Sequence, residues 1–190
     1  MLLALLLITI SIAAAQSALP DEPPTQTDRL RWAAITTIGP ASLLGGAITS
    51  AISTAQDRPL EYGISWKGYG ERQALRLSGA ATSNLMETEL GALWGEDPRY
   101  RRMKQGPFKS RLWNVVKMSV EAYNAQGQTR PAYARFIAIP TSNIVANAWR
   151  PDSQHTVGET SARIGFGFVS RIASNTFVEF WPDIRRVLRR

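Results

Sequence analysis

The sequence predicts an all-α protein, a bundle of about five helices rich in small residues. Two observations favour this class: residues 32–56 carry no charge, and later apolar segments likewise end near prolines. Within the uncharged stretch, small side chains recur every fourth residue, and residues four apart share one face of a helix. Such a stripe lets another helix backbone approach closely. The stripe consists of Ala33, Thr37, Ala41, Gly45, Thr49 and Ser53. A second small stripe lies beside it and consists of Ser42, Gly46, Ser50 and Thr54.

The N-terminus is typical of a secretory signal peptide. An apolar run over Leu2–Ile12 is followed by three alanines, so we expect residues 1–15 to be removed before Gln16. No Lys or Arg precedes the run, which is atypical of such peptides. A flexible, Pro-rich lead-in over 16–28 and a single helical domain over 29–190 should follow. The expected location is therefore outside the cytoplasm, in the periplasm or the outer membrane.

The elements can be placed in order along the chain. The first helix should begin at Thr27 or Asp28, kink at Gly39-Pro40 and end before Pro59. An aromatic, Gly-rich loop is expected over Tyr62–Gly70. Five further segments are expected: a second helix from about Glu71 to Trp94, an amphipathic third helix over Lys109–Asn124, an apolar segment over Ala132–Trp149 interrupted by Pro140, another over Thr156–Phe180, and a short basic tail over Pro182–Arg190.

Three asparagines lie in the middle of these apolar segments, each followed by a tryptophan. The spacing suggests two related helical hairpins. A buried amide must be hydrogen-bonded or it destabilises the fold. Asn84, Asn143 and Asn175 can therefore meet at one level and set the helix register. Alternatively, they line a polar ligand cavity together with the turn at Glu96, Asp97 and Arg99.

Three motifs carry a resemblance to a known group of sequences. They are Tyr62-Gly63 with Trp66, Gly68, Tyr69 and Gly70; Glu96-Asp97-Pro98-Arg99-Tyr100; and Glu179-Phe180-Trp181-Pro182-Asp183. Over about residues 30–185 the chain resembles a family of uncharacterised exported bacterial proteins. The resemblance implies a single envelope domain and brings no activity, substrate or cofactor.

The chain shows no pattern typical of a catalytic centre, so the catalytic residues are unknown. His155, the one histidine, stands in a polar turn, and there is no G-x-S-x-G motif to support a nucleophilic serine. The chain has no cysteine, which excludes disulfides and thiolate metal sites. We predict no metal and no cofactor.

The net charge of +7 indicates an anionic partner. For an exported protein, anionic lipid or surface polymer is favoured over nucleic acid. A solubilising surface role is the alternative for the same cations. The candidate contact residues are Arg101, Arg102, Lys104, Arg185, Arg186, Arg189 and Arg190.

Three hypotheses for function follow. The first is a non-enzymatic envelope protein that associates with a membrane or forms a homo-oligomer. The second is a soluble periplasmic ligand-binding protein or hydrolase with a polar cavity between its helices. The third is a small outer-membrane β-barrel, with strands over residues 133–139 and 164–180, although the period of four in the first helix opposes it.

Overall fold

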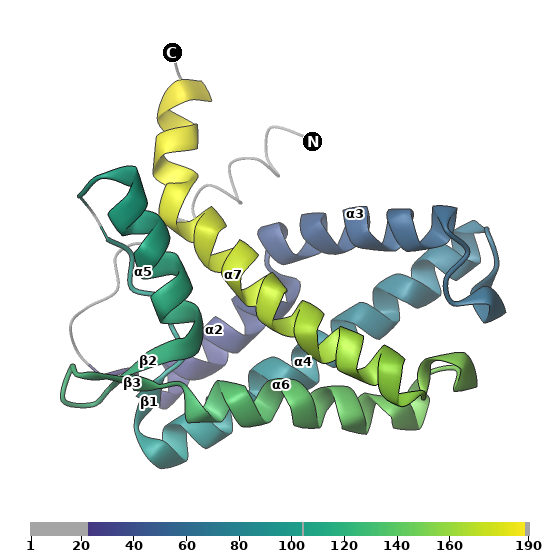
Figure 1. Ribbon diagram of the computed structural model, residues 1–190, viewed down its shortest axis with the longest axis horizontal. Coiled ribbons are helices and arrows are strands. Elements are labelled where there is room, and N and C mark those ends of the chain that lie inside the picture. Colours follow the sequence, from purple (N-terminus) through teal and green to yellow (C-terminus); the bar gives the residue numbers. More distant parts are fainter. Residues whose placement is uncertain (1–22, 104, 189–190) are drawn as a thin grey trace.

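Helices make up most of the chain in the computed structural model, which describes residues 23–103 and 105–188 (Figure 1). The α-helices are α2 (Gln26–Ile38), α3 (Pro40–Ala55), α4 (Trp66–Trp94), α5 (Phe108–Val120), α6 (Tyr133–Val145) and α7 (Val157–Leu188). Short 3-10 turns are η1 (Leu60–Tyr62), η2 (Ala146–Trp149) and η3 (Asp152–Gln154). The predicted all-α class is confirmed. The barrel alternative is excluded, because its expected strands lie in α6 and α7.

A small antiparallel sheet in the order β1-β2-β3 lies beside the helices. Its strands are β1 (Glu96–Asp97), β2 (Glu121–Asn124) and β3 (Thr129–Pro131). In the register, Asp97 pairs with Tyr123, which also pairs with Thr129. The sheet and α5 occupy one end of the molecule, and α7 runs from the other end across to them (Figure 1).

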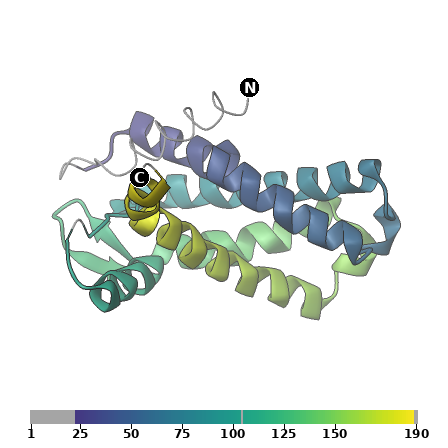
Figure 2. The same cartoon turned by 90° about the horizontal axis from the view of Figure 1, so that it is seen from above.

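Helix α4 lies at the centre of the bundle. It packs against α2 and α3 on one side and against α6 on the other, and α7 packs against α6 and α5 (Figure 2). The left-handed conformation of Gly95, with φ of 70°, ends α4 as the sequence predicts. The expected signal peptide and most of the lead-in lie outside the described residues.

The first predicted helix occurs as α2 and α3, interrupted at Gly39. Thr25 caps it, two or three residues before the predicted start. Its hydroxyl accepts a hydrogen bond from the Asp28 amide, and the Asp28 carboxylate accepts one from the Thr25 amide at 3.0 Å. Pro40 then starts α3, where its missing N–H costs nothing.

The small-residue stripe does not continue as a packing face within the chain. Ala33 and Thr37 are buried, but beyond the break the next members of the stripe are exposed: Ala41, Gly45 and Thr49. Ser53 is half-buried. The physical reason is the extended backbone of Gly39, with ψ of 160°, which turns α3 about its axis relative to α2.

The neighbouring small residues of α3 face α4 instead. Gly46 and Ser50 are buried, and the Ser50 hydroxyl donates to the Gln73 side chain at 2.9 Å. A Cβ atom at Gly46 would collide with the guanidinium of Arg76. Small residues therefore do bring α3 close to α4, and they belong to the second of the two small stripes.

Two further boundaries differ from the expected ones. Helix α4 begins at Trp66 within the expected loop, because the Ser65 hydroxyl caps it by accepting from the Gly68 amide at 3.0 Å. Helix α5 ends at Val120, and residues 121–124 form a strand because they pair with β3 in a hairpin. The predicted tail is also helical, since α7 continues through Pro182.

Compared with an ordinary globular domain, this bundle has an inverted pattern of burial: it buries few large apolar side chains and many charged or polar ones. The few large apolar side chains that are buried are Trp32, Tyr100, Val115, Met118 and Ile139. Many more large apolar side chains are exposed, on α3, α5, α6 and α7. The interior holds charged and polar groups instead, and these form the candidate site.

Candidate functional site

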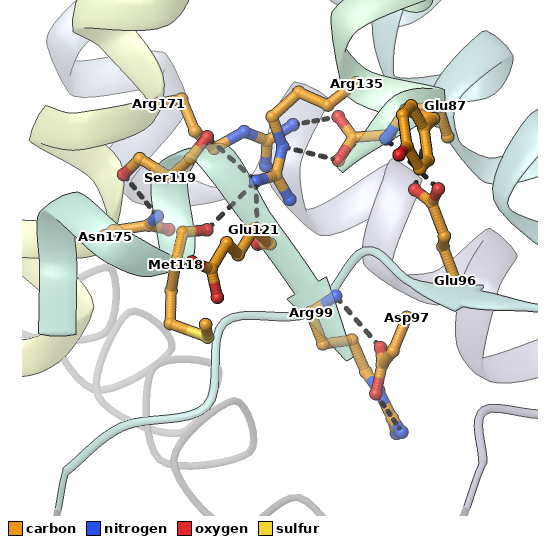
Figure 3. Close-up of polar contacts among 12 residues, drawn as sticks. Glu87, Glu96, Asp97, Arg99, Met118, Ser119, Glu121, Arg135, Arg171 and Asn175 are labelled. Carbon is orange, nitrogen blue, oxygen red and sulfur yellow. Dashed lines mark hydrogen bonds and ion pairs between the residues drawn. The ribbon is translucent and has the colours of Figure 1, made fainter. Parts of the chain in front are cut away.

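Glu87 of α4 lies at the centre of a buried ionic network (Figure 3). Its Oε1 accepts from Arg135 Nε of α6 at 2.9 Å, and its Oε2 accepts from Arg171 of α7. The three side chains are at least nine-tenths buried. A carboxylate held by two guanidiniums joins three helices that are far apart in the sequence. These ion pairs connect the helices in the way that apolar contacts connect them in an ordinary core.

Arg135 extends the network to α5. Its Nη1 donates to the backbone carbonyls of Met118 and Ser119, both at 2.9 Å. These carbonyls belong to the last turn of α5, where intrahelical partners are missing and the helix dipole favours a cation. Arg135 therefore neutralises Glu87 and caps α5 with the same guanidinium.

Arg171 contacts the N-terminal helix as well. Its guanidinium lies over the Trp32 ring, 5.0 Å from the centroid. Burial lowers the pKa of Arg171 to about 10, while the adjacent Glu87 carboxylate opposes that shift. At neutral pH the side chain remains a cation, paired and stacked.

Glu96 caps the start of α6. Its carboxylate oxygens accept from the backbone amides of Tyr133 and Ala134, each at 3.1 Å. Its own carbonyl accepts from Arg29 of α2 at 2.7 Å. Burial raises the pKa of Glu96, and the two amide hydrogen bonds oppose the rise.

Asp97 and Arg99 form a local ion pair in the turn after α4. Arg99 Nε donates to Asp97 Oδ1 at 2.9 Å, and the Arg99 amide donates to the same oxygen at 3.0 Å. Arg101 lies 3.5 Å from the other carboxylate oxygen and stacks over the Tyr123 ring. These interactions stiffen the turn and its strand.

Glu179 of α7 anchors the far side of this turn. Its carboxylate accepts from the Tyr100 hydroxyl at 2.8 Å, from the Met103 amide at 3.0 Å and from Arg111 Nε at 2.8 Å. Burial and the carboxylate raise the pKa of Tyr100, so its hydroxyl remains a donor. Arg111 also pairs with Asp183 at 2.6 Å. The second and third sequence motifs therefore contact each other.

The three asparagines do not meet. Asn84 donates to the Thr37 hydroxyl at 2.9 Å, and Asn175 donates to the Ser119 hydroxyl at 2.9 Å. Asn143 donates to the Ile139 carbonyl within its own helix at 2.9 Å. Each amide is satisfied separately, so the register role applies to Asn84 and Asn175 as individual contacts between helices. The predicted cavity shared with Glu96, Asp97 and Arg99 is not formed by these contacts.

The predicted anion-contacting residues are not uniformly placed. Arg101 is half-buried in its ion pair with Asp97, and Arg102 and Arg185 are half-buried. Arg186 is exposed and lies 3.7 Å from Asp183. The others lie outside the described residues: Lys104, Arg189 and Arg190.

Five residues of the network are not among the predicted site residues: Glu87, Arg111, Arg135, Arg171 and Glu179. A signal for two of them exists in the sequence. Arg135 and Arg171 are isolated charges within long apolar segments, where burial requires a counter-ion. Their common partner Glu87 could not be identified, because nothing local in the sequence distinguishes it from Glu89.

The arrangement of these groups is structural. Each buried carboxylate is already held by guanidiniums, amides or a hydroxyl, so its oxygens are committed to the fold. Among the residues that the structure describes, no group of three or more His, Asp or Glu side chains is placed to hold a metal ion. Comparison with protein-family models, with characterised proteins and with solved structures finds no match.

Proposed function

We propose that this is a membrane-associated, non-enzymatic envelope protein that lies with its apolar outer surface against lipid. The observation that carries the proposal is the inverted burial, with ions and amides inside and large apolar side chains outside. In water such a surface invites association. Against lipid it is favourable, and the internal ion pairs satisfy the polar groups.

Helix α5 exposes an apolar face, while a face of mixed polarity points inward. On the inward face Val115 and Met118 pack with Tyr100, Arg111 binds Glu179, and Asn114 donates to the Tyr100 hydroxyl at 2.9 Å. Its apolar face points outward and consists of Phe108, Leu112, Trp113, Val116 and Val120. Trp113 is 68 % exposed. A helix with an exposed apolar face is suited to lie in the plane of a membrane interface.

Cations accompany this apolar face. Lys109 is exposed in the first turn of α5, and Lys117 lies one turn before its end. Tryptophan beside basic residues is typical of the membrane–water interface. The combination favours an anionic lipid surface as the partner, in agreement with the net charge of +7.

The N-terminal helix adds a second apolar element. From Gln26 to Ala55 it is long and apolar enough to cross a membrane, and 22 % of its most apolar stretch is buried within the protein. The core helix of a soluble protein and a signal sequence can be equally long and apolar. Its position near the N-terminus is compatible with export or anchoring. The location in an envelope compartment is part of our proposal.

A homo-oligomer is the second candidate. The observation that favours it is the exposed small-residue face of α3, formed by Ala41, Gly45 and Thr49. Such a face allows the same helix of a second copy to pack closely. The ligand-binding alternative has less support, since the three asparagines are separately satisfied.

Flotation of the mature protein with vesicles tests the proposal. Wild-type protein should float with vesicles that contain phosphatidylglycerol, and Trp113→Ser should reduce the bound fraction several-fold. Trp66→Ser is the matched control, because Trp66 is 89 % exposed but lies in the first turn of α4, at the end of the bundle away from α5. Wild-type protein that stays unbound, as discrete oligomers in detergent-free buffer, would contradict membrane association and favour the second candidate.

A further inference from the structure

Three half-buried arginines lie away from the ionic network, around the first half of α4 and the start of α7. They are Arg76 on α4, Arg150 after η2 and Arg163 on α7. Over residues 23–103 and 105–188, none of the three makes an ion pair. Each also has a buried Nε without a hydrogen-bond partner in this part of the chain. Guanidiniums desolvated in this way are costly unless a counter-ion joins them.

Arg150 and Arg163 both donate hydrogen bonds to Gln154. Arg150 Nη1 donates to the side-chain oxygen of Gln154 at 2.7 Å, and Arg163 Nη1 donates to the backbone carbonyl of Gln154 at 2.7 Å. Burial and the nearby positive charge of Arg163 together lower the pKa of Arg150 to about 10. Two guanidiniums are therefore close together, and the residue that accepts a hydrogen bond from each of them, Gln154, is neutral.

Every other side chain that holds Arg163 is neutral. Its Nη2 donates to the Asn147 side chain and to the Thr160 hydroxyl, the latter at 3.1 Å. Glu159 favours its charged form but is exposed and forms no ion pair with it. On the Arg150 side, the acidic group Glu61 is engaged with the Ser153 hydroxyl at 2.9 Å. Among the described residues, therefore, neither arginine of the pair is ion-paired with a carboxylate.

Arg76 differs from this pair because burial alone lowers its pKa, with no neighbouring cation contributing. Its Nη2 donates to both the backbone carbonyl and the hydroxyl of Ser42, at the contact between α3 and α4. It acts as a helix-packing group. This leaves Arg150 and Arg163 as the pair that lacks an anion.

We propose that Arg150 and Arg163 bind the phosphate group of an anionic ligand. Planar guanidiniums recognise phosphate through paired, charge-assisted hydrogen bonds, and their two charges match those of an oxyanion. The phosphate can belong to a lipid headgroup or to a free, soluble phosphate. The inference goes beyond membrane association, because the soluble form needs no lipid.

Thermal unfolding of the mature protein tests the site. Inorganic phosphate should raise the melting temperature of wild-type protein by a few degrees relative to chloride at the same ionic strength, since a ligand bound to the folded state stabilises it. The variant R150Q/R163Q should lose this rise. The matched control is R31Q/R130Q, which removes the same charge from exposed positions on α2 and β3 and should keep the rise.

A second measurement separates the two sources of phosphate. If inorganic phosphate has no effect, vesicles with phosphatidylglycerol should still bind wild-type protein more strongly than R150Q/R163Q, and the ligand is then a lipid. Line broadening of the phosphorus NMR signal by wild-type protein gives an independent reading if the double variant fails to fold. The site is refuted if neither probe distinguishes wild type from the variant, or if wild type binds neither. Loss of flotation in Trp113→Ser alone leaves the phosphate site unaffected.

Discussion

Two groups of arginines in this bundle are accommodated in opposite ways. Around the small sheet, Arg111, Arg135 and Arg171 each pair with a buried carboxylate, Glu87 or Glu179. Around η2 and η3, Arg150 and Arg163 are held by neutral groups. The first arrangement is complete within the chain. In the second, neither arginine is ion-paired with a carboxylate of the described residues, which is the reason to look for a ligand there.

Removing the central carboxylate should produce the largest effect. Glu87→Gln leaves Arg135 and Arg171 buried without their counter-ion, and breaking a buried ion pair in this way costs about 3–5 kcal/mol. Denaturant titration should show a clear loss of unfolding free energy. Glu89→Gln is the matched control, because Glu89 is exposed and two residues away. Equal stability of the two variants would refute the structural role of the network.

The two kinds of arginine can be compared directly. Arg171→Gln should destabilise the protein by about 2–3 kcal/mol, because it unpairs one oxygen of Glu87 and removes the contact with Trp32. In phosphate-free buffer, Arg150→Gln should change the stability by less than about 1 kcal/mol, because the lost hydrogen bond to Gln154 is offset by relief of charge repulsion. A larger loss of unfolding free energy in Arg150→Gln would contradict the proposed difference between the two groups of arginines.

A smaller effect is expected in the pH dependence of stability. Since burial raises the pKa of Glu96, the folded state holds this proton more tightly than the unfolded state. Glu96 should therefore lower stability as the pH rises from its ordinary pKa of about 4.3 through its raised value in the folded protein. Glu96→Gln should remove this component. The difference in unfolding free energy between wild type and variant, measured from pH 4 to pH 8, checks the sign.

Much of the fold could be predicted because its signals are local. The uncharged stretch, the break at Gly39-Pro40 and the stop at Gly95 all act through neighbouring backbone. The strand at 121–124 could not be predicted, because the segment has the composition of a helix end and becomes a strand by pairing with β3. The start of α4 was misplaced because the glycines after Ser65 are typical of a loop.

The members of the ionic network could be recognised from the sequence only in part, for a related reason. Glu96, Asp97 and Arg99 stand together in the chain and do form part of the network. The pairing of Glu87 with Arg135 and Arg171 joins residues 48 and 84 positions apart. Sequence patterns show which charges are isolated among apolar neighbours, but they do not show which carboxylate will meet them.

By itself the sequence determined the helical class, the order of the helices and most of their ends, because hydrogen bonding, capping and proline geometry are local. The tertiary structure alone decided which faces turn inward. On α5, Val115, Met118 and the ion pair of Arg111 with Glu179 face the protein, while Phe108 and Trp113 face outward. Both faces of this helix carry apolar residues, so periodicity alone does not show which one is buried. Glu179 reaches Arg111 only through the fold, because the two residues are 68 positions apart in the sequence.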